Sequence, residues 1–522
     1  MKYTIYKSAF LLVLTLGIAF VSCNDEWDKH YEEDTFEGAD VSMMEYLEAN
    51  SDLSTFTSMV KSVGYDKVLQ TSQSFTIWAP VNDALVDVDL TDETLVKHIV
   101  TNHIARGRVG TSGIVESLIK MQSGKNVGFE KSGDLFTFGH AELLQQNIPV
   151  NNGLTHVLNQ YAPYLNNLKE YIGDLEGLDS LKSYIYGNDQ HIFNPAASTV
   201  IDIDEQGRRI YDSTFIDNNL ILDAIGDLAN EDSVYTTIYP TNTAWIEAYN
   251  RIKPYFNFPD VLGGEDYSEE MTKYTLVKDM VFRNKIENPS TYDSISSTTD
   301  TKYYNPAELF ANTEMLEASN GYAYITDLMP FSDTVSWFNK IQLEAETSAT
   351  RDNSNSYPFI RTSYNSGLDI SEDSYLYVEP SSPNAKPSVT FSLDNILSAK
   401  YNIYCVFVPE TIVATDTIKT EVSFVLTYIN STTGRVRRLR VTPSDNVVKA
   451  DGLTKMLVTQ FDFEYTNVPY ISYDEDENVT IEEFPVKLEV INEVTDAESS
   501  NADLKLTRNM RIDCIKLEPV LE

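Results

Sequence analysis

Among the three cysteines of this 522-residue chain, Cys23 has the clearest chemical context. Lys2 and Lys7 precede the apolar run Ala9–Phe20, and the small residue Ser22 stands directly before the cysteine. A basic start, a short apolar run and a small residue form the pattern of a secretion signal. The run is shorter than the about 20 apolar residues that a membrane-spanning helix needs. Cleavage after Ser22 would place the Cys23 thiol at the mature N-terminus, where it could be acylated.

The sequence around Cys23 resembles a bacterial lipobox, with Phe20 where leucine is usual. We expect residues 1–22 to be a lipoprotein signal peptide and Cys23 to carry the lipid anchor; the alternative is a plain secretion signal with an incidental cysteine. Residues 23–38 form an acidic tether that resembles export signals of some Gram-negative gut bacteria. This resemblance implies a lipid-anchored outer-membrane protein facing the cell exterior, although any solvated tether would also be acidic.

The composition restricts the class of partner. The formal net charge of −40 argues against nucleic acid and anionic lipid headgroups, because phosphate binding relies on Lys and Arg. The apolar fraction of 42% is ordinary for a globular protein and predicts large cores. Cations, basic proteins and neutral ligands such as glycans remain possible partners.

Two segments of the first part of the chain recur, in the same order, later in the first two thirds of the chain. "SFTIWAPVNDAL" at 74–85 is paralleled by "SVYTTIYPTNTAW" at 233–245, and "NNGLTHVLNQYAP" at 151–163 by "SNGYAYITDLMP" at 319–330. Matches in the same order predict an internal duplication. The matched positions are Pro80 and Pro240, Asn82 and Asn242, Ala84 and Ala244, and Asn152-Gly153 and Asn320-Gly321.

Polar residues before the apolar periodic stretches predict helix starts. Asp40, Asp52 and Thr91 stand at such positions, so we expect each to open a helix. Asn82 and Asn242 are interpreted as caps and turn formers rather than ligands. The insertion at 201–213 places Asp202, Asp204 and Glu205 before Gly207, but without the final glutamate of a calcium loop, and predicts a solvated hairpin.

The duplicated segments resemble the fasciclin-like domain. Its two signatures are similar to "FTIWAPVNDAL" at Phe75–Leu85 and "GLTHVLNQYA" at Gly153–Ala162. The resemblance implies two mixed α/β domains, each a β-sandwich wedged with helices, at 39–163 and, divergent and with insertions, at 164–335. It also implies a role in cell adhesion or matrix contact without enzymatic activity.

Many fasciclin-like domains carry a Tyr-His pair linked to adhesion, and this sequence departs from it. Asn102 stands where the tyrosine is expected, and His103 lies four residues after Ile99 on one helical face. We expect His103 to be buried and hydrogen-bonded. In the second repeat "FRNKI" at Phe282–Ile286 occupies the corresponding place, so the adhesive role of the pair is not transferred to either repeat.

Residues 340–522 differ in pattern, because short alternating strands replace helical periodicity and predict an all-β antiparallel sandwich. Ile341–Glu346 and Ile512–Pro519 resemble the first and last strands of galactose-binding-like jelly rolls. That resemblance implies a fold shared by many carbohydrate-binding modules; a sugar ligand is implied by kinship alone. Cys405 and Cys514 fall in predicted strands, where two buried free thiols are favoured over a disulfide.

Aromatic side chains are the candidate ligand contacts of this sandwich. It contains none of the four tryptophans, so tyrosine and phenylalanine would have to stack on a sugar, although more of them are expected in the core or on the strand surface. The candidates are Tyr357, Phe359, Tyr364, Tyr375, Tyr377, Tyr470 and Tyr473.

The chain lacks a G-x-S-x-G elbow, a glycine-rich phosphate loop, an H-E-x-x-H helix and a C-x-x-C pair, and its six histidines show no metal spacing. We therefore assign no catalytic residue, no metal ligand and no cofactor. The function favoured is a non-enzymatic surface lipoprotein for adhesion or ligand binding, an accessory of glycan capture or uptake beside a SusC/SusD-type importer. The alternatives are an adhesin that contacts proteins on host or neighbouring cells, and a glycan hydrolase whose paired carboxylates meet only in space.

Overall fold

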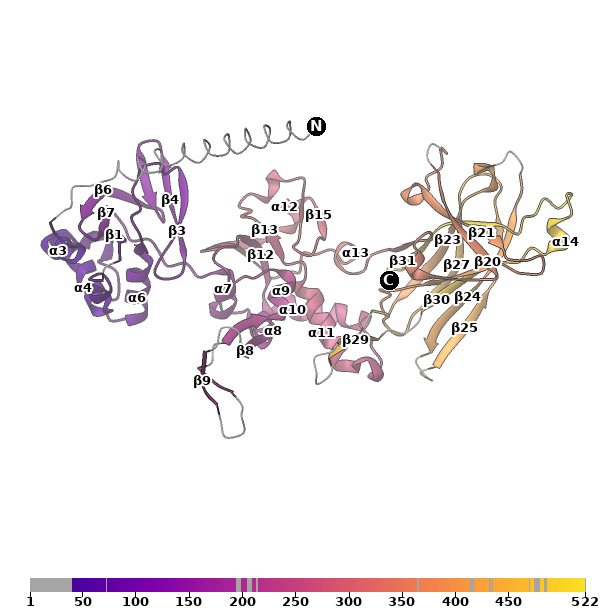
Figure 1. Cartoon of the computed structure of the whole chain (residues 1–522), viewed down its shortest axis with the longest axis horizontal. Helices are drawn as coiled ribbons and strands as arrows, with labels where there is room; N and C mark the ends of the chain where they lie inside the picture. Colours follow the sequence, from indigo (N-terminus) through magenta and orange to yellow (C-terminus); the bar gives the residue numbers. More distant parts are fainter. Residues whose placement is uncertain are drawn as a thin grey trace, which may run out of the picture. The chain divides into compact units, whose positions relative to one another are not determined.

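The computed structural model (Figure 1) describes residues 40–71, 73–193, 199–203, 209–212, 215–363, 366–413, 417–430, 433, 435–468, 470–473, 479–482 and 486–521. These residues form two compact units. Unit 1 holds residues 40–171 together with Leu228–Val234 and Glu317–Gly321, and unit 2 holds the other described residues. The predicted signal peptide, Cys23 and the acidic tether lie outside the described residues.

Short helices begin the first repeat, and each is capped one or two residues away from the predicted position. Ser42, rather than Asp40, caps the first helix through a capping box with Glu45. Asp92, rather than Thr91, caps the helix that ends at Asn102. The helix predicted to begin at Asp52 starts with a 3₁₀ turn that Asn50 caps. The elements are α3 Met43–Ala49, η1 Ser51–Leu53, α4 Ser54–Ser62, α5 Tyr65–Val68, η2 Asn82–Leu85 and α6 Glu93–Asn102.

A seven-stranded sheet in the order β2-β1-β7-β6-β5-β4-β3 completes the first repeat. Its two signature strands, β1 and β7, are parallel neighbours, with Phe75 opposite Gly153. Both strands are buried along their whole length, which explains their near-continuous apolar sequences. The strands are β1 Phe75–Pro80, β2 Ile104–Arg106, β3 Glu116–Lys120, β4 Asn126–Ser132, β5 Leu135–Phe138, β6 Ala141–Val150 and β7 Gly153–Leu158.

The second repeat contains a sheet in the order β13-β12-β17-β16, which repeats the order β2-β1-β7-β6 of the first. The duplication predicted from sequence is therefore confirmed in topology. Its strands are β12 Tyr235–Pro240, β13 Val281–Arg283, β14 Ser294–Ser296, β15 Lys302–Tyr304, β16 Thr313–Ala318 and β17 Gly321–Thr326. Its helices are α7 Leu168–Asp174, α8 Asp179–Gly187, α9 Leu220–Ile225, α10 Asn242–Ile252, η3 Lys253–Tyr255, η4 Asp260–Leu262, α11 Gly264–Val277, η5 Pro289–Thr291, α12 Pro306–Leu309 and α13 Asp333–Ser336.

The insertion in the second repeat forms two antiparallel ladders. Strands β9 Thr199–Ile203 and β10 Arg209–Asp212 pair with one another, as the predicted hairpin requires. Strands β8 Asp189–Phe193 and β11 Phe215–Asn219 form the second ladder.

Most of the remaining strands form two antiparallel sheets, as predicted for a sandwich, while β28 and β29 form a separate two-stranded ladder. The first has the order β20-β21-β31-β23-β27, with β18 also paired to β31, and the second has the order β19-β22-β30-β24-β25, with β26 paired to β24. The strands are β18 Ile341–Glu344, β19 Arg351–Ser354, β20 Ser356–Thr362, β21 Ser374–Pro380, β22 Ser388–Ser392, β23 Lys400–Phe407, β24 Thr420–Asn430, β25 Arg435–Val441, β26 Val447–Val448, β27 Thr454–Asp462, β28 Tyr470–Tyr473, β29 Val479–Glu482, β30 Lys487–Asn492 and β31 Met510–Pro519. Short helical turns connect them: η6 Ser348–Thr350, η7 Ser371–Asp373, η8 Glu410–Ile412 and α14 Asp496–Ser499.

Cys405 and Cys514 are buried on adjacent strands and are not bonded to one another, as predicted. Within the described part of the chain, no helix combines the length and apolar character that crossing a membrane would require.

Candidate functional site

Three of the predicted aromatic ligand residues share one face of the paired strands β20 and β21. Phe359 is the direct partner of Tyr377, and Tyr357 stands two residues before Phe359. Since side chains alternate along a strand and direct partners share a face, these three rings lie on the same side of the sheet. Tyr357 is 55% exposed and Phe359 39% exposed, and β20 is an edge strand. This face therefore presents aromatic rings to solvent.

The other four candidate ligand residues do not belong to this exposed group. Tyr375 is only 2% exposed and packs with Ile370 and Val408 in an apolar cluster. A ring enclosed in this way has no surface to offer a sugar, so the structure removes Tyr375 from the candidates. Tyr364 lies outside the described residues. Tyr470 and Tyr473 belong to β28, and their side chains also lie outside the described part.

Two arginines accompany the exposed rings. The guanidinium carbon of Arg361 lies 5.1 Å from the ring centroid of Phe359 and 5.5 Å from that of Tyr377, and that of Arg511 lies 4.6 Å from Tyr377. These are cation–π distances. Arg511 also forms a two-point ion pair with Glu410, in which both side chains are largely buried. Arg361 is exposed and has no ion pair among the described residues.

We name this surface the aromatic–arginine platform; it consists of Tyr357, Phe359, Arg361, Tyr377 and Arg511. The sequence analysis missed both arginines. Arg361 continues the alternation of Tyr357 and Phe359, which was a usable signal. Arg511 had no such signal, because only strand pairing places it opposite Tyr377.

The surroundings of Tyr377 in the platform keep its phenol neutral. Burial and a hydrogen bond to the Glu379 carboxylate raise the pKa of Tyr377 to about 12. The phenol therefore keeps its proton at every physiological pH. The two cations beside the rings have different partners: Arg511 pairs with Glu410, and Arg361 lies over the faces of Phe359 and Tyr377.

A second constellation lies where β18 pairs with β31. Ligand atoms of Glu344, Asp513 and Cys514 lie within 4.8 Å of one another. Burial, with a smaller contribution from Glu344, raises the pKa of Asp513 to about 6, while Ser371 N donates to its Oδ1 at 3.0 Å. Carboxylate oxygens are ligands that hard cations prefer, so this group could hold a cation. The sequence analysis missed it because Glu344 and Asp513 stand at opposite ends of the domain.

The first repeat encloses His103 completely, as predicted. Its Nδ1 lies 2.6 Å from Ile99 O, and its Nε2 accepts from Ala162 N at 2.9 Å. Burial lowers the pKa of His103 to about 4, so the ring is neutral. Asn102 is also buried, donating to Pro163 O and accepting from Ser123. Neither residue reaches the surface, so neither can make the adhesive contact of a Tyr-His pair.

The counterpart of His103 in the second repeat is Met280 and not the segment Phe282–Ile286. Trp78 N donates to His103 O, and Ile238 N donates to Met280 O, from equivalent positions of β1 and β12. The preceding residues, Asn102 and Asp279, are therefore equivalent as well. The predicted alignment of Phe282–Ile286 with the segment around His103 was therefore wrong. It was based on residue types, whereas strand pairing makes Val281 equivalent to Ile104.

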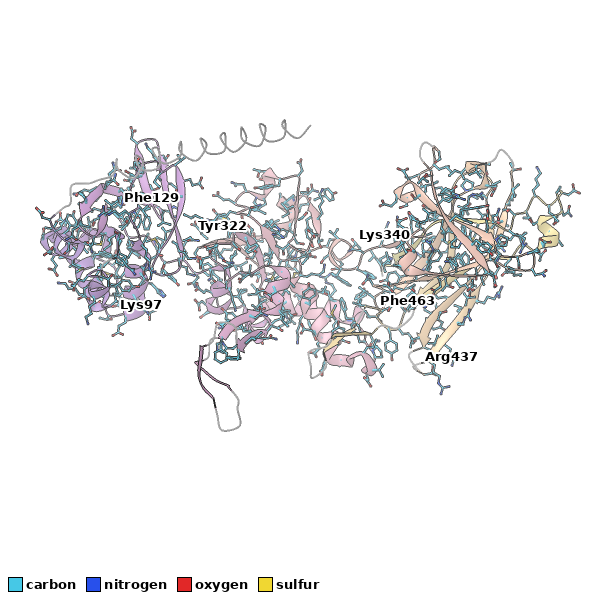
Figure 2. The ribbon with its side chains drawn as sticks, in the orientation of Figure 1. Lys97, Phe129, Tyr322, Lys340, Arg437 and Phe463 are labelled. Atoms are coloured by element: carbon cyan, nitrogen blue, oxygen red, sulfur yellow. The ribbon has the colours of Figure 1, made fainter. Side chains whose placement is uncertain are left out.

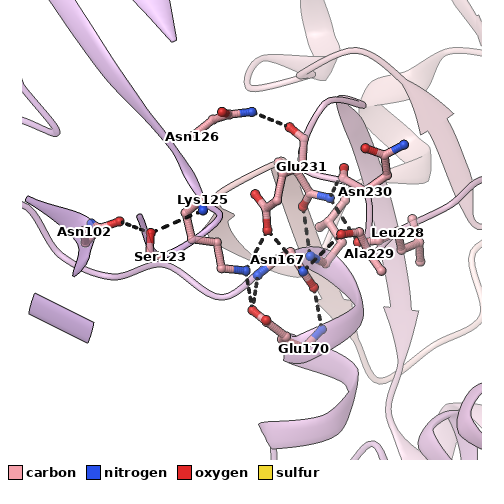
Figure 3. Close-up of polar contacts among 12 residues, drawn as sticks. Asn102, Ser123, Lys125, Asn126, Asn167, Glu170, Leu228, Ala229, Asn230 and Glu231 are labelled. Atoms are coloured by element: carbon pink, nitrogen blue, oxygen red, sulfur yellow. Dashed lines mark hydrogen bonds and ion pairs between the residues drawn. The ribbon is translucent and has the colours of Figure 1, made fainter. Parts of the chain in front are cut away.

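A buried lysine holds together distant segments of unit 1 (Figure 3). Lys125 Nζ lies 2.6 Å from Glu170 Oε2 and 2.6 Å from Glu231 Oε1, and its side chain is 5% exposed. Asn126 Nδ2 also donates to Glu231 O, and Asn167 Nδ2 to Ala229 O. Burial lowers the pKa of Lys125, but the two carboxylates outweigh it and the net shift is upward. The group is therefore a structural ion-pair cluster that joins distant segments of the chain.

Comparison with known protein families gives one match, which lies in the first repeat. A model of the fasciclin domain matches residues 51–161, within the segment predicted for the first fasciclin-like domain. No curated protein matches the chain.

Among solved structures, the FAS1 domain pair of the insect cell adhesion molecule Fasciclin I is similar at 11% identity, over 55% of this chain and 99% of that one, with a TM-score of 0.22. A CBM35 module from Paenibacillus barcinonensis is similar at 9% identity over 34% of this chain and 99% of that one, with a TM-score of 0.18. The mannan-recognising module TmCBM27 is similar at 10% identity over 35% and 99%, with a TM-score of 0.19.

Proposed function

We propose that this chain is a non-enzymatic, lipid-anchored surface protein whose C-terminal sandwich binds glycans at the aromatic–arginine platform. The observation that supports this site is the register pair Phe359–Tyr377, with Tyr357 alongside, on an open face at a sheet edge. Sugar rings present flat C–H faces that pack on aromatic rings, and ring hydroxyls need polar neighbours. Both are present within one small surface.

The arginines supply the directional hydrogen-bond donors of the platform. A guanidinium carries five N–H donors in a planar fork, so it can bind adjacent hydroxyls or a carboxylate at two points. Arg361 has this capacity unused among the described residues, because only the faces of Phe359 and Tyr377 contact it. Arg511 is committed to Glu410 and supports Tyr377 from the opposite strand.

The proposed setting is the outer membrane, where an acylated Cys23 would tether the chain and the acidic run at 23–38 would keep it away from the lipid surface. The fasciclin domain at 51–161 supports a role in surface contact. A SusC/SusD-type importer is the partner we propose for the glycan. Intact-mass measurement of protein purified from its native membrane tests the anchor, since an unmodified Cys23 would exclude it.

The glycan site is tested with the mature chain and a panel of neutral and acidic glycans. Phe359→Ala should weaken the best glycan at least about tenfold, which corresponds to about 1.4 kcal/mol. Tyr304→Ala is the matched control, because Tyr304 is 70% exposed but belongs to the second repeat. Equal losses in both variants, or no binding by the unchanged chain, would exclude the platform.

A second candidate function is adhesion to proteins on another cell, supported by the fasciclin match at 51–161. Cell-binding that survives Phe359→Ala and is competed by no glycan would favour it. A hydrolase is the third candidate, and release of sugar products from the glycan panel by the purified chain would reveal it.

A further inference from the structure

Strand β25 concentrates positive charge in a strongly acidic chain. The sequence "RVRRLR" at 435–440 places four arginines in six residues, whereas the whole chain carries a net charge of −40. All six residues are exposed, and β25 is an edge strand of its sheet. Charged residues protect sheet edges from pairing with other chains, which accounts for charge on this strand but not for its distribution between the two faces.

The four arginines divide evenly between the faces of β25. Arg438 and Arg440 face outward and form ion pairs with Glu489 at 2.9 Å and Glu493 at 2.5 Å. Arg435 and Arg437 lie on the opposite face, because side chains alternate along the strand. Neither has a hydrogen bond or ion pair among the described residues, and Figure 2 shows the Arg437 side chain extending away from the strand.

A cavity of about 170 Å³ is lined by the β24 residues that pair with these two arginines. Arg437 is the direct cross-strand partner of Tyr428, and Arg435 of Asn430, and both partners line the cavity. Direct partners share a face with their Cβ atoms about 5 Å apart, so both arginine side chains leave β25 on the face that carries Tyr428 and Asn430. The wall opposite carries Phe461, whose ring centroid lies 4.7 Å from that of Tyr428.

The polar groups of the cavity suit hydroxyls rather than a second anion. Asn430 offers an amide, and Asp462 and Glu464 also contribute to the lining. Carboxylates accept hydrogen bonds from hydroxyl groups but repel another carboxylate. A ligand that fits therefore presents an apolar ring face to Tyr428 and Phe461, hydroxyls to the polar lining residues, and its negative charge toward the face of β25 that carries Arg435 and Arg437.

We propose that Arg435 and Arg437, with the Tyr428–Phe461 cavity, form a site for the uronic-acid residues of an acidic polysaccharide. A hexuronate has this combination of ring face, hydroxyls and one carboxylate, and the planar guanidinium fork binds a carboxylate at two points. Residues on one face of a strand recur about every 7 Å, so the two arginines can each meet a charge along an extended sugar chain.

The remaining charge of the molecule selects against denser polyanions. Duplex DNA carries one charge per about 1.7 Å, and the net charge of −40 repels it over a Debye length of about 10 Å. A polyuronate carries one charge per sugar, and its binding rests on contacts shorter than that length. The site lies between β24 and β25 of the second sheet and the end of β27 in the first, whereas the aromatic–arginine platform lies on β20, β21 and β31. The inference therefore stands whether or not the platform binds sugar.

The test measures affinity of the mature chain for polygalacturonate by calorimetry at low salt, with neutral dextran as the reference polymer. Arg435→Gln/Arg437→Gln should lose at least tenfold in affinity. Arg438→Gln/Arg440→Gln removes the same charge from the opposite face and should lose less than threefold. Arg437→Lys keeps the charge without the fork and should fall between them. Tyr304→Ala, at an exposed tyrosine of the second repeat, should leave the affinity unchanged.

Three results would overturn the proposal. Equal losses in the two double variants would mean that bulk charge alone attracts the polymer. Binding of duplex DNA or of vesicles with anionic headgroups as tight as that of polygalacturonate would assign the arginines to another class of partner. Absence of polygalacturonate binding by the unchanged chain, with its melting temperature intact, would remove the site altogether.

Discussion

The two repeats share a backbone arrangement but differ in the polar group that they bury at its centre. In the first, Asn102 is neutral and has two hydrogen-bond partners, Pro163 O and Ser123 Oγ. In the second, Asp279 is 1% exposed and acts as the acceptor for a whole cluster. Its partners are Lys278, Ser297, Thr299, Tyr303 and Ser336.

The comparison shows that this position requires a satisfied polar group and not a particular charge. The pKa of Asp279 is lowered, because Lys278 and the surrounding hydroxyls outweigh the effect of burial, which alone would raise it. In the first repeat Thr101 stands where Lys278 stands in the second, and an amide suffices. Duplicated strands can thus diverge in charge when the neighbouring residues change together.

The largest effect is expected from Asp279→Ala. The change removes the acceptor shared by four hydroxyls and by Lys278, whose side chain is 19% exposed, and should cost about 3–5 kcal/mol of the free energy of unfolding. Asn102→Ala strands one hydroxyl and one carbonyl and should cost about 1–3 kcal/mol. Hydrogen exchange of the β12 and β1 amides reports each repeat separately. An equal cost in the two repeats would show that charge at this position has no energetic consequence.

Acidification should weaken the first repeat before the second. The pKa of His103 is about 4 in the folded state against about 6.5 in the unfolded chain, so its stabilising contribution is full above pH 6.5 and is lost as pH falls toward 4. The difference amounts to about 3 kcal/mol. The lowered pKa of Asp279 acts in a lower pH window, because its contribution persists above about pH 4 and is lost only below it.

His103→Met, which installs the residue of the second repeat, tests this assignment. Exchange of the β1 amides measured from pH 7 to pH 4.5 should depend less on pH than in the unchanged chain, while β12 serves as the internal control. Some dependence should remain, because burial also lowers the pKa of His156. An unchanged profile in the variant would exclude His103 as the titrating group.

Lys125 has no charged counterpart in the second repeat, where Thr301 takes the equivalent place. Lys125→Met leaves Glu231 buried and unpaired and should cost about 2 kcal/mol, less than a fully buried pair because Glu170 is 40% exposed. Lys120→Met is the control, since its pair with Asp232 is exposed on both sides and should contribute less than about 1 kcal/mol. Exchange of the β4 amides measures both. If the two variants lost the same free energy of unfolding, burial of the Lys125 ion pair would not explain its contribution.

The sequence predicted those parts of the fold that rest on local pattern. The duplication, the sandwich, the buried His103 and the free thiols follow from period, spacing and residue type. What it missed depends on contacts between distant segments. Arg511 meets Tyr377 and Asp513 meets Glu344 through strand register, which a one-residue choice of pairing decides and which a single sequence does not record directly. Tyr375 shares the face of Tyr377 but is buried by its apolar cluster with Ile370 and Val408, which strand alternation does not predict.

The smallest loss of stability is expected from removing two equivalent helix caps, one in each repeat. Asn82 Oδ1 accepts from Thr55 N in the first turn of α4, and Asn242 Oδ1 accepts from Ser180 N in the first turn of α8, both at 2.9 Å. Each asparagine thus caps a helix other than the one it begins, which the sequence analysis did not distinguish. Removing a cap costs about 1 kcal/mol, so Asn82→Ala and Asn242→Ala should destabilise their repeats equally.

The aspartate variants isolate the acceptor in each cap. Asn82→Asp keeps the oxygen and gives up the Nδ2 donation to Ser51 O, so it should recover most of the loss. Asn242→Asp should recover less, because its Nδ2 donates to the Asp179 carboxylate and a second carboxylate there would be repelled. Melting curves at two salt concentrations separate the terms, since only the repulsion is screened. If Asn242→Asp were as stable as Asn82→Asp at low salt, the two caps would not differ in the electrostatic way that their partners imply.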